Sequence, residues 1–261
     1  MNAKLSVLMI TKNAAETLEK SLASIKKIAS EIIIVDSKST DRTVEIAKNY
    51  LAKVYIKEFT DIGKQRIFGL SKATGKWILI LDCDEVVSKE LSREIVSLFH
   101  GSIIKENGFY IPFQNFYLGR PVKYGGENYM MLRLFRKNSV SITPSLIHEH
   151  FELSKGKSGR LKGKIFHHSY RSLLQIFVKF TDYGIRMAKE KFLAGEKSSL
   201  KKIFLYPPHL FWARFIKDKG YKDGSSRIPL DLGFAYMEMV TYVFLLHYNI
   251  SNSKVKSQKS K

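Results

Sequence analysis

Short apolar runs alternate with segments of helical periodicity through the first 81 residues. The β-branched run that follows Glu31 lacks any alternation of apolar and polar residues, which is typical of a strand covered on both faces. The predicted strands are Leu5–Ile10, Glu31–Val35, Val54–Ile56 and Trp77–Leu81, and the predicted helices between them are Glu16–Ile28, a segment capped by Asp41, and Ile62–Ala73. This order predicts an α/β fold with a parallel, doubly wound sheet.

Polar side chains follow three of the predicted strands. They are Thr11 and Asn13, then Asp36 and Ser37, then Asp82 and Asp84. Ligands of doubly wound sheets bind beyond the carboxyl ends of the strands, so we expect these residues to converge on one crevice. Neither the glycine pattern of dinucleotide-binding loops nor that of P-loops occurs in the sequence, which argues against a nicotinamide enzyme and a P-loop ATPase.

The segment from Asp82 to Glu85 carries three acids directly after a buried strand. Carboxylates at positions i and i+2 suit a hard divalent cation, Mg²⁺ or Mn²⁺, which completes its shell with substrate phosphates. A plain strand end that feeds a helix cap is one alternative. A haloacid-dehalogenase-like phosphotransferase is another, but its acidic motif follows the first strand of the fold and needs a later acidic pair, whereas here the motif follows the fourth strand.

Charge separates the chain into two parts. The whole sequence carries 44 basic and 24 acidic residues, a net charge of +20; residues 1–150 hold 22 basic and 16 acidic side chains (+6), and residues 151–261 hold the remaining 22 and 8 (+14). Such a surplus implies a polyanionic partner, and a nucleic-acid-binding protein is a competing class. The basic residues show no nucleic-acid-binding motif, however, so we expect no nucleic-acid partner.

Residues 173–246 read as helices in which aromatic and apolar residues mix with lysines and arginines, the composition of helices that lie in a membrane interface. No run reaches the roughly 18 uninterrupted apolar residues of a membrane span, since Glu238 breaks the longest candidate, and the first apolar run is too short for a signal peptide. The single cysteine, Cys83, fits a reducing compartment. We therefore expect a cytoplasmic protein that is peripheral on the inner membrane.

Several motifs together resemble glycosyltransferase family 2. They are Ser6–Asn13, Glu31–Thr43, Gly63–Arg66, Ala73–Glu85 and Arg133–Arg136. The segments Asn115–Arg120, Ile147–His150 and His168–Tyr170 are similar to the lipopolysaccharide-core β-1,4-glucosyltransferase type within that family. The resemblance implies a GT-A fold, a doubly wound mixed sheet with a Rossmann-like nucleotide half, that uses a nucleotide-diphosphate sugar, a UDP-sugar by first choice, and a divalent cation, with inversion at the anomeric carbon.

The resemblance also implies roles for individual residues. Thr11, Asn13, Asp36, Ser37, Arg66 and Asp82 would bind the nucleotide sugar, Asp84 would be the direct metal ligand with Asp82 beside it, and His168 would add a metal or diphosphate contact. The general base would be Glu149, with Glu127 as the alternative, since both lie in the acceptor half. The acceptor would be a lipid-linked or phosphorylated saccharide on an anionic membrane surface, as in lipopolysaccharide-core or related cell-envelope synthesis.

The expected domain organisation follows from these patterns. Residues 1–170 form the catalytic domain, residues 171–250 form a helical, membrane-associating extension, and residues 251–261 form a disordered basic tail with four lysines.

Overall fold

The computed structural model describes residues 4–101, 103–143 and 150–259. The chain divides into two compact units. Unit 1 comprises residues 1–115 and 129–169, and unit 2 comprises residues 116–128 and 170–261. One boundary between the units lies near residue 170, and residues 116–128 belong to unit 2, which no pattern in the sequence indicated. The assignment of residues 1–170 as the catalytic domain stays a prediction.

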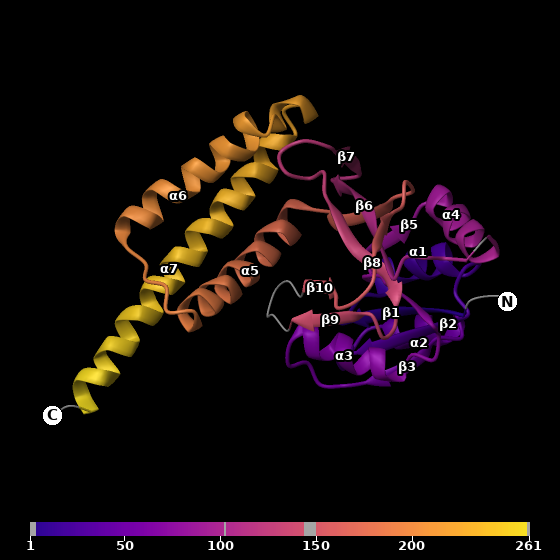
Figure 1. Cartoon of the computed structure of the whole chain (residues 1–261). Coiled ribbons are helices and arrows are strands. Elements are labelled where there is room, and N and C mark those ends of the chain that lie inside the picture. The colour runs from indigo at the N-terminus through magenta and orange to yellow at the C-terminus, as the bar shows by residue number, and fades with distance from the viewer. Residues whose placement is uncertain (1–3, 102, 144–149, 260–261) are drawn as a thin grey trace. The chain divides into compact units, whose positions relative to one another are not determined.

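Unit 1 is built on a mixed sheet, most strands of which are labelled in Figure 1. Its strand order is β3-β2-β1-β4-β8-β6-β12-β5. The strands are β1 (Leu5–Thr11), β2 (Glu31–Asp36), β3 (Lys53–Ile56), β4 (Trp77–Ile80), β5 (Glu85–Val87), β6 (Gly108–Tyr117), β8 (Met130–Arg136) and β12 (Ile165–Tyr170). Strands β1 to β4 pair in parallel, whereas β8 is antiparallel to both β4 and β6. The predicted doubly wound mixed sheet is confirmed.

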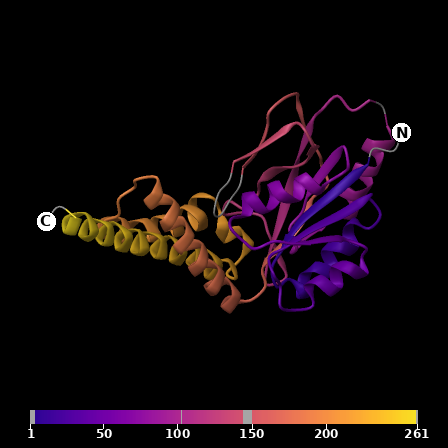
Figure 2. The ribbon, with the colours of Figure 1, turned by 90° about the horizontal axis from the view of Figure 1, so that it is seen from below.

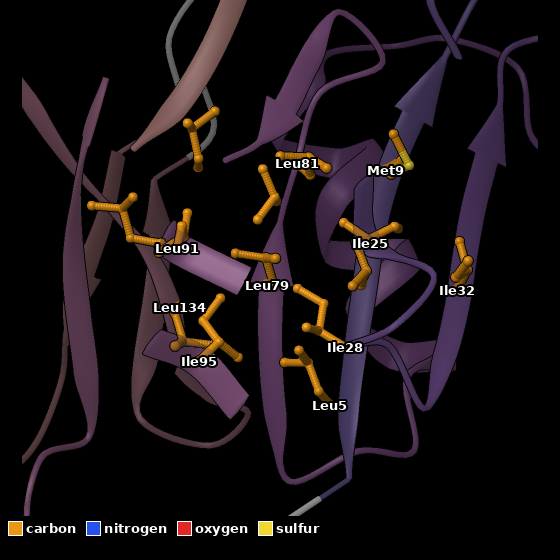
Figure 3. Close-up of a cluster of buried hydrophobic side chains, with 14 of the residues drawn as sticks. Leu5, Met9, Ile25, Ile28, Ile32, Leu79, Leu81, Leu91, Ile95 and Leu134 are labelled. Atoms are coloured by element: carbon orange, nitrogen blue, oxygen red, sulfur yellow. The ribbon is translucent and has the colours of Figure 1, made fainter. Parts of the chain in front are cut away.

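Two apolar layers cover the faces of this sheet, because successive strand residues point to opposite sides. Leu5, Val7 and Met9 of β1 pack with helices α1 (Ala15–Ile25), α2 (Thr43–Asn49) and α4 (Lys89–His100), and Figure 3 shows part of this cluster. Leu8 packs on the opposite face. That face is covered by α3 (Ile62–Lys72) and the hairpin of β9 (Val140–Thr143) and β10 (His150–Leu153). Helices lie on both faces of the sheet in Figure 2.

Unit 2 is helical, and its long helices are α5 (Leu173–Leu193), α6 (Leu200–Trp212) and α7 (Arg227–Lys259). Helices α5 and α6 both run alongside α7 (Figure 1). Gly184 of α5 permits a close approach, since a Cβ there would lie 2.9 Å from the carbonyl oxygen of Met237 in α7. Phe180 and Phe234 pack across the same interface with ring centroids 4.8 Å apart. The helical extension therefore has a small aromatic core of its own.

Shorter elements complete the described chain. In unit 2, a π-helical turn (Ala213–Lys217) and a 3₁₀ turn (Gly220–Asp223) connect α6 to α7. The short strands β7 (Arg120–Val122) and β11 (Ser158–Arg160) both pair with β6.

Helix α7 differs from its prediction in two ways. It continues to Lys259, whereas the sequence suggested a disordered tail from Ser251. The stretch from Arg227 to Asn252 is also long and apolar enough, with a mean hydropathy of 1.3, to cross a membrane by length and composition. The core helix of a soluble protein passes the same test, and 39% of the most apolar window is buried inside the protein. The described residues contain one such stretch.

Candidate active site

The carboxyl ends of β1 and β2 are joined through Asp36, whose side chain is fully buried. Parallel pairing places Thr11 opposite Asp36, and the Thr11 hydroxyl donates to Asp36 Oδ2 at 2.8 Å. Ser39 donates its backbone N–H to Oδ1 at 2.8 Å and its hydroxyl to Oδ2 at 2.5 Å. The strand ends therefore meet as expected, and Asp36 orders the loop that follows it. Its contact with a nucleobase stays a prediction.

Asn13 shapes the same loop from the β1 side. Its φ of 49° lies in the left-handed region that asparagine tolerates better than most residues. Its backbone N–H donates to Ser39 Oγ and its side-chain oxygen accepts from the N–H of Thr40, both at 2.8 Å. Lys12 Nζ donates to the carbonyl oxygen of Ser37 at 2.8 Å. The predicted nucleotide residues thus build one ordered loop pair.

Helix α3 delivers two buried polar side chains to this region. Asp61 caps the helix by accepting from the N–H of Lys64 at 2.7 Å. One turn later, the Gln65 amide donates to Ser37 Oγ at 3.2 Å and Arg66 Nη2 lies 2.6 Å from Asp82 Oδ1. The sequence marked Arg66 but not Gln65, although both belong to the same short motif.

Asp82 lies between two buried guanidinium groups. Arg66 and Arg133 are 4% and 5% exposed in their side chains, and Arg133 Nη2 lies 3.5 Å from Asp82 Oδ2. Burial alone would raise the pKa of Asp82, but the charges of Arg66 and Arg133 hold this pKa below its ordinary value. Asp82 is therefore anionic at neutral pH. Arg133 was visible in a family motif, but its long-range partner could not be inferred from sequence.

Glu85 contacts both Asp82 and Arg133 of this cluster. Its side chain is 1% exposed, accepts from the backbone N–H of Asp82 at 2.9 Å, and lies 3.0 Å from Arg133 Nη2. Burial raises the pKa of Glu85 to about 7 although Arg133 opposes the shift. The third acid of the motif is thus a positioning residue that fixes the backbone at Asp82. Cys83, between the acids, packs against the hydrophobic core, where burial raises the pKa of its thiol.

Asp84 faces the imidazole of His167, the residue directly before the predicted His168. His167 Nε2 lies 3.5 Å from Asp84 Oδ1, and His167 also contacts Asn115 Oδ1 at 3.1 Å through Nδ1. Ser169 Oγ lies 2.5 Å from His167 Nε2. Strand β12 is antiparallel to β5, and His167 pairs with Glu85 in this register. The pairing, which sequence cannot reveal, explains why this histidine faces the acidic segment.

His168, the predicted metal or diphosphate contact, approaches Asp84 with its backbone. Its N–H donates to the carbonyl oxygen of Asp84 at 3.0 Å. Since neighbouring residues on a strand point to opposite faces, the ring of His168 leaves the face on which His167 meets Asp84. The role of His168 as a metal or diphosphate contact stays a prediction.

Asp84 and His167 together fit a divalent cation as part of its ligand set. Among the described residues, no group of three or more His, Cys, Asp or Glu side chains is arranged to hold a metal ion. Mg²⁺ needs few protein ligands, because one or two carboxylates with substrate phosphates and waters suffice. The partly exposed Asp84 carboxylate, 23% accessible, meets this requirement, while Asp82 is engaged by arginines.

The two candidate bases lie in different settings. Glu149, the preferred base, falls outside the described residues. Glu127 belongs to unit 2, is 4% exposed, and lies 2.5 Å from Arg214 Nη2 and 3.5 Å from Arg227 Nη2. A carboxylate held by the buried guanidinium group of Arg227 and the partly buried one of Arg214 is well suited to fix a loop. The choice between these residues as general base stays a prediction.

Solved structures align with this chain at low similarity. Staphylococcus aureus TarS matches at 14% identity over 94% of this chain and 55% of TarS, with a TM-score of 0.47. Glucosyl-3-phosphoglycerate synthase from Mycobacterium tuberculosis, solved with Mn²⁺, UDP and glucosyl-3-phosphoglycerate, matches at 21% identity over 45% of each chain, with a TM-score of 0.33. At these scores the ligands of those proteins carry no argument for this one.

Sequence comparison is more informative. An uncharacterized glycosyltransferase of Rickettsia bellii is 32% identical over 100% of this chain and 92% of its own length. A second one, from Rickettsia felis, is 32% identical over 75% of this chain and 73% of its own length. The model of the family "Glycosyl transferase family 2" matches residues 6–140, which contain β1 apart from Leu5, the strands β2 to β4, Arg66 and the acidic segment. With its GT-A type sheet, the chain is a glycosyltransferase that belongs to glycosyl transferase family 2.

Proposed function

We propose that this enzyme moves a hexosyl group, with inversion, from a nucleotide-diphosphate donor to a saccharide acceptor, using Mg²⁺ or Mn²⁺. The proposed donor is a UDP-sugar. The proposed acceptor is a lipid-linked or phosphorylated saccharide of the lipopolysaccharide-core or a related cell-envelope glycan, which resembles the substrate class of the lipopolysaccharide-core β-1,4-glucosyltransferase type. The proposed location is the cytoplasmic face of the inner membrane.

One observation carries the donor part of this proposal. Three segments distant in sequence meet at the carboxyl ends of neighbouring strands, namely the Thr11–Asp36 pair, the Arg66–Asp82 pair and Asp84 with His167. Hydroxyl and carboxylate groups suit a nucleoside, the guanidinium groups suit a diphosphate, and a partly exposed carboxylate suits a divalent cation. A nucleotide-diphosphate sugar presents all three kinds of chemistry.

The division of work among these residues follows from their contacts. When bound by Asp84 and His167, a divalent cation supplies Lewis-acid stabilisation of the charge on the departing diphosphate. Arg66 and Arg133 neutralise Asp82, so the region can accept an anionic donor, and Glu85 holds Asp82 in place. Glu149 would remove the proton of the acceptor hydroxyl as general base.

The donor proposal is tested by thermal shift and by transfer. We expect one of the UDP-, GDP-, ADP- and dTDP-sugars to raise Tm in the presence of Mn²⁺ and to lose this effect in EDTA. Asp84→Asn should lower transfer by at least about 10²-fold, the size of a lost cation contact, with Tm near that of the unliganded wild type. Asp182→Asn, which removes a partly exposed carboxylate of α5, is the matched control. Wild-type transfer by Asp84→Asn in EDTA would refute the cation assignment.

The membrane part rests on the surface of unit 2. On α5, the residues Ile176, Phe180, Gly184 and Ala188 are buried at a spacing of four. Leu173, Leu174, Phe177 and Val178, near the start of this helix, are 55–74% exposed, although Phe177 also stacks on Tyr236 of α7. An apolar stripe exposed to water along a helix is a marker of an interaction surface.

Helix α6 adds a second exposed apolar stripe. Leu200, Phe204 and Trp212 are 50–70% exposed at multiples of four residues. A cavity of about 450 Å³ between α6 and α7 is lined by Pro207, Pro208, Phe211, Leu232, Ala235, Tyr236 and Met239. Because residues 170–261, which form most of unit 2, carry 17 basic and 7 acidic side chains, a net charge of +10, an anionic lipid surface matches both the apolar stripes and the charge.

Vesicle sedimentation tests this surface. The protein should pellet with vesicles rich in anionic lipid, release in high salt, and ignore purely zwitterionic vesicles. Leu174→Glu should weaken vesicle binding without changing Tm, because this side chain is 74% exposed, and Leu51→Glu, at a 90% exposed position of unit 1, is the control. Equal binding to neutral and anionic vesicles, or tighter salt-sensitive binding to RNA, would overturn the membrane assignment.

A further inference from the structure

A polar cavity lies in unit 1, at the end of the sheet opposite to the acidic segment. Its volume is about 530 Å³, within the range of small-molecule sites. Lys76 lines it at the amino end of β4, whereas Asp82 follows the carboxyl end of this strand. Arg136, Lys137 and Lys155 supply the other charged walls. The described lining contains four cationic side chains and no carboxylate.

Two of these cations are held by the protein backbone. The Arg136 guanidinium donates to the carbonyl oxygen of Ile104 at 2.9 Å and to that of Glu106 at 3.3 Å, and it lies 4.8 Å from the ring centroid of Trp77. Lys137 Nζ donates to the carbonyl oxygen of Ala73 at 2.6 Å. These bonds use neutral acceptors, so they orient the charges without neutralising them.

A turn at Gly156, hydrogen-bonded to Asn107, places Lys155 at the wall of the cavity. Asn107 donates its side-chain N–H to the carbonyl oxygen of Lys155 at 3.1 Å and its backbone N–H to that of Lys157 at 2.8 Å. Gly156 has a φ of +83°, and a Cβ at this position would lie 2.2 Å from Asn107 Nδ2. The turn therefore requires glycine and is positioned against Asn107, so Lys155 projects from a fixed backbone.

The described residues of unit 1 offer these four cationic side chains no carboxylate partner. In the described part of the chain, no carboxylate lies within salt-bridge distance of Lys76, Arg136, Lys137 or Lys155. Glu31 accepts from the N–H groups of Thr74 and Gly75 at this end of the sheet, but it is paired with Lys53 at 3.0 Å. Four converging positive charges create a field that favours an anion with several charges.

We propose that this cavity binds a phosphorylated ligand at a site separate from the donor crevice. A phosphate group carries up to two charges and accepts several hydrogen bonds, which suits lysine and arginine side chains at fixed positions. The amide of Asn138 lines the same cavity and adds donors for phosphate oxygens. The phosphate belongs either to a free phosphorylated molecule or to a lipid headgroup.

Inorganic pyrophosphate is the probe for the phosphate chemistry, titrated by calorimetry into the full chain in EDTA, so that no divalent cation recruits it to the crevice. The test variant is Lys76→Glu/Lys155→Glu, because both side chains are exposed and their reversal leaves the core intact. The control variant is Lys20→Glu/Lys48→Glu, two exposed positions of α1 and α2 that change the net charge equally. We expect saturable binding that the test variant weakens by about tenfold or more and the control by less than about twofold. Equal affinity of the two variants, or no saturable binding, would overturn the proposal.

A vesicle-binding experiment distinguishes a free phosphorylated molecule from a lipid headgroup. Vesicles that contain phosphatidic acid are compared with vesicles of phosphatidylcholine alone. If the test variant also binds phosphatidic acid vesicles less tightly than the control variant, the ligand is a lipid headgroup. If only pyrophosphate binding is lost, the ligand is a free phosphorylated molecule.

Discussion

Each unit buries a network of arginines and carboxylates, and the two networks differ in their access to solvent. In unit 1, Asp82 remains 29% exposed between Arg66 and Arg133. In unit 2, Arg227 and Asp231 are fully buried, and Arg227 donates to Asp231 Oδ1 at 3.0 Å and to the carbonyl oxygen of Gly125 at 2.9 Å. The first network lies at the strand ends next to the Asp84 carboxylate, and the second closes a loop onto helices.

The difference shows that burial of charge does not by itself mark a catalytic group. Glu127 and Glu149 look alike in sequence, since each stands in a polar motif of the acceptor half. The structure distinguishes Glu127, because Arg214 and Arg227 hold its carboxylate in the buried network of unit 2, which we call the closed network. The partly exposed network around Asp82 in unit 1 is the open network. An open network can receive a ligand, whereas a closed one contributes to folding.

The largest expected effect concerns Glu149. Glu149→Gln should lower turnover by about 10²- to 10⁴-fold, the contribution of a general base, while donor affinity stays near that of the wild type. Steady-state transfer together with donor titration separates these two quantities. Unchanged turnover would remove Glu149 from the mechanism.

Glu127→Gln is the companion variant. If Glu127 belongs to the closed network alone, turnover per folded molecule stays within a few-fold of wild type and the urea midpoint falls, because Arg214 loses a charged partner. A large loss of turnover at unchanged stability would instead make Glu127 the base.

The closed network should dominate the stability of unit 2. Arg227→Ala leaves Asp231 and Glu127 with one guanidinium, that of Arg214, and should lower the free energy of unfolding by about 3–5 kcal/mol. Arg186→Ala removes a more exposed i,i+4 pair with Asp182 and should cost about 0.5 kcal/mol or less. Urea unfolding followed by circular dichroism measures both. Similar losses for the two variants would contradict the contrast between the networks.

Glu31 makes a smaller, pH-dependent contribution to the free energy of unfolding, mostly through hydrogen bonds from neutral groups. Burial would raise its pKa, but hydrogen bonds from Ser6 and Thr74, with Lys53, lower it from 4.5 to about 2. Because the folded-state pKa is the lower one, the stabilisation is present above about pH 4.5 and is lost as the pH falls towards 2. Glu31→Gln should cost about 2–3 kcal/mol at pH 7 and progressively less in acid, as measured by urea unfolding at several pH values. A constant difference across this range would exclude the linkage.

The strand and helix order of residues 5–81 could be predicted from sequence because it depends on local periodicity. Strand β1 extends one residue beyond its predicted end at Ile10, and the strand-end residues Thr11 and Asp36 meet as parallel topology requires. The GT-A type fold is confirmed on this basis and by the family match.

Pairings between distant strands could not be predicted in this way. The face of His167 depends on its register opposite Glu85, and the partner of Arg133 depends on an antiparallel strand some 50 residues away. The insertion of residues 116–128 into unit 2 likewise depends on the acceptors offered by Asp223 and on Arg227. These features are set by tertiary packing, which no local pattern records.

The middle segment 116–128 has a consequence for modularity. Asp223 accepts from the backbone N–H groups of Lys123 and Tyr124, and Glu127 completes the closed network. The C-terminal helices therefore cannot be exchanged between proteins as an independent module cut at residue 170. A chimera cut there would separate Arg214 and Arg227 from a partner encoded about 90 residues earlier, so a successful swap must transplant both stretches of chain together.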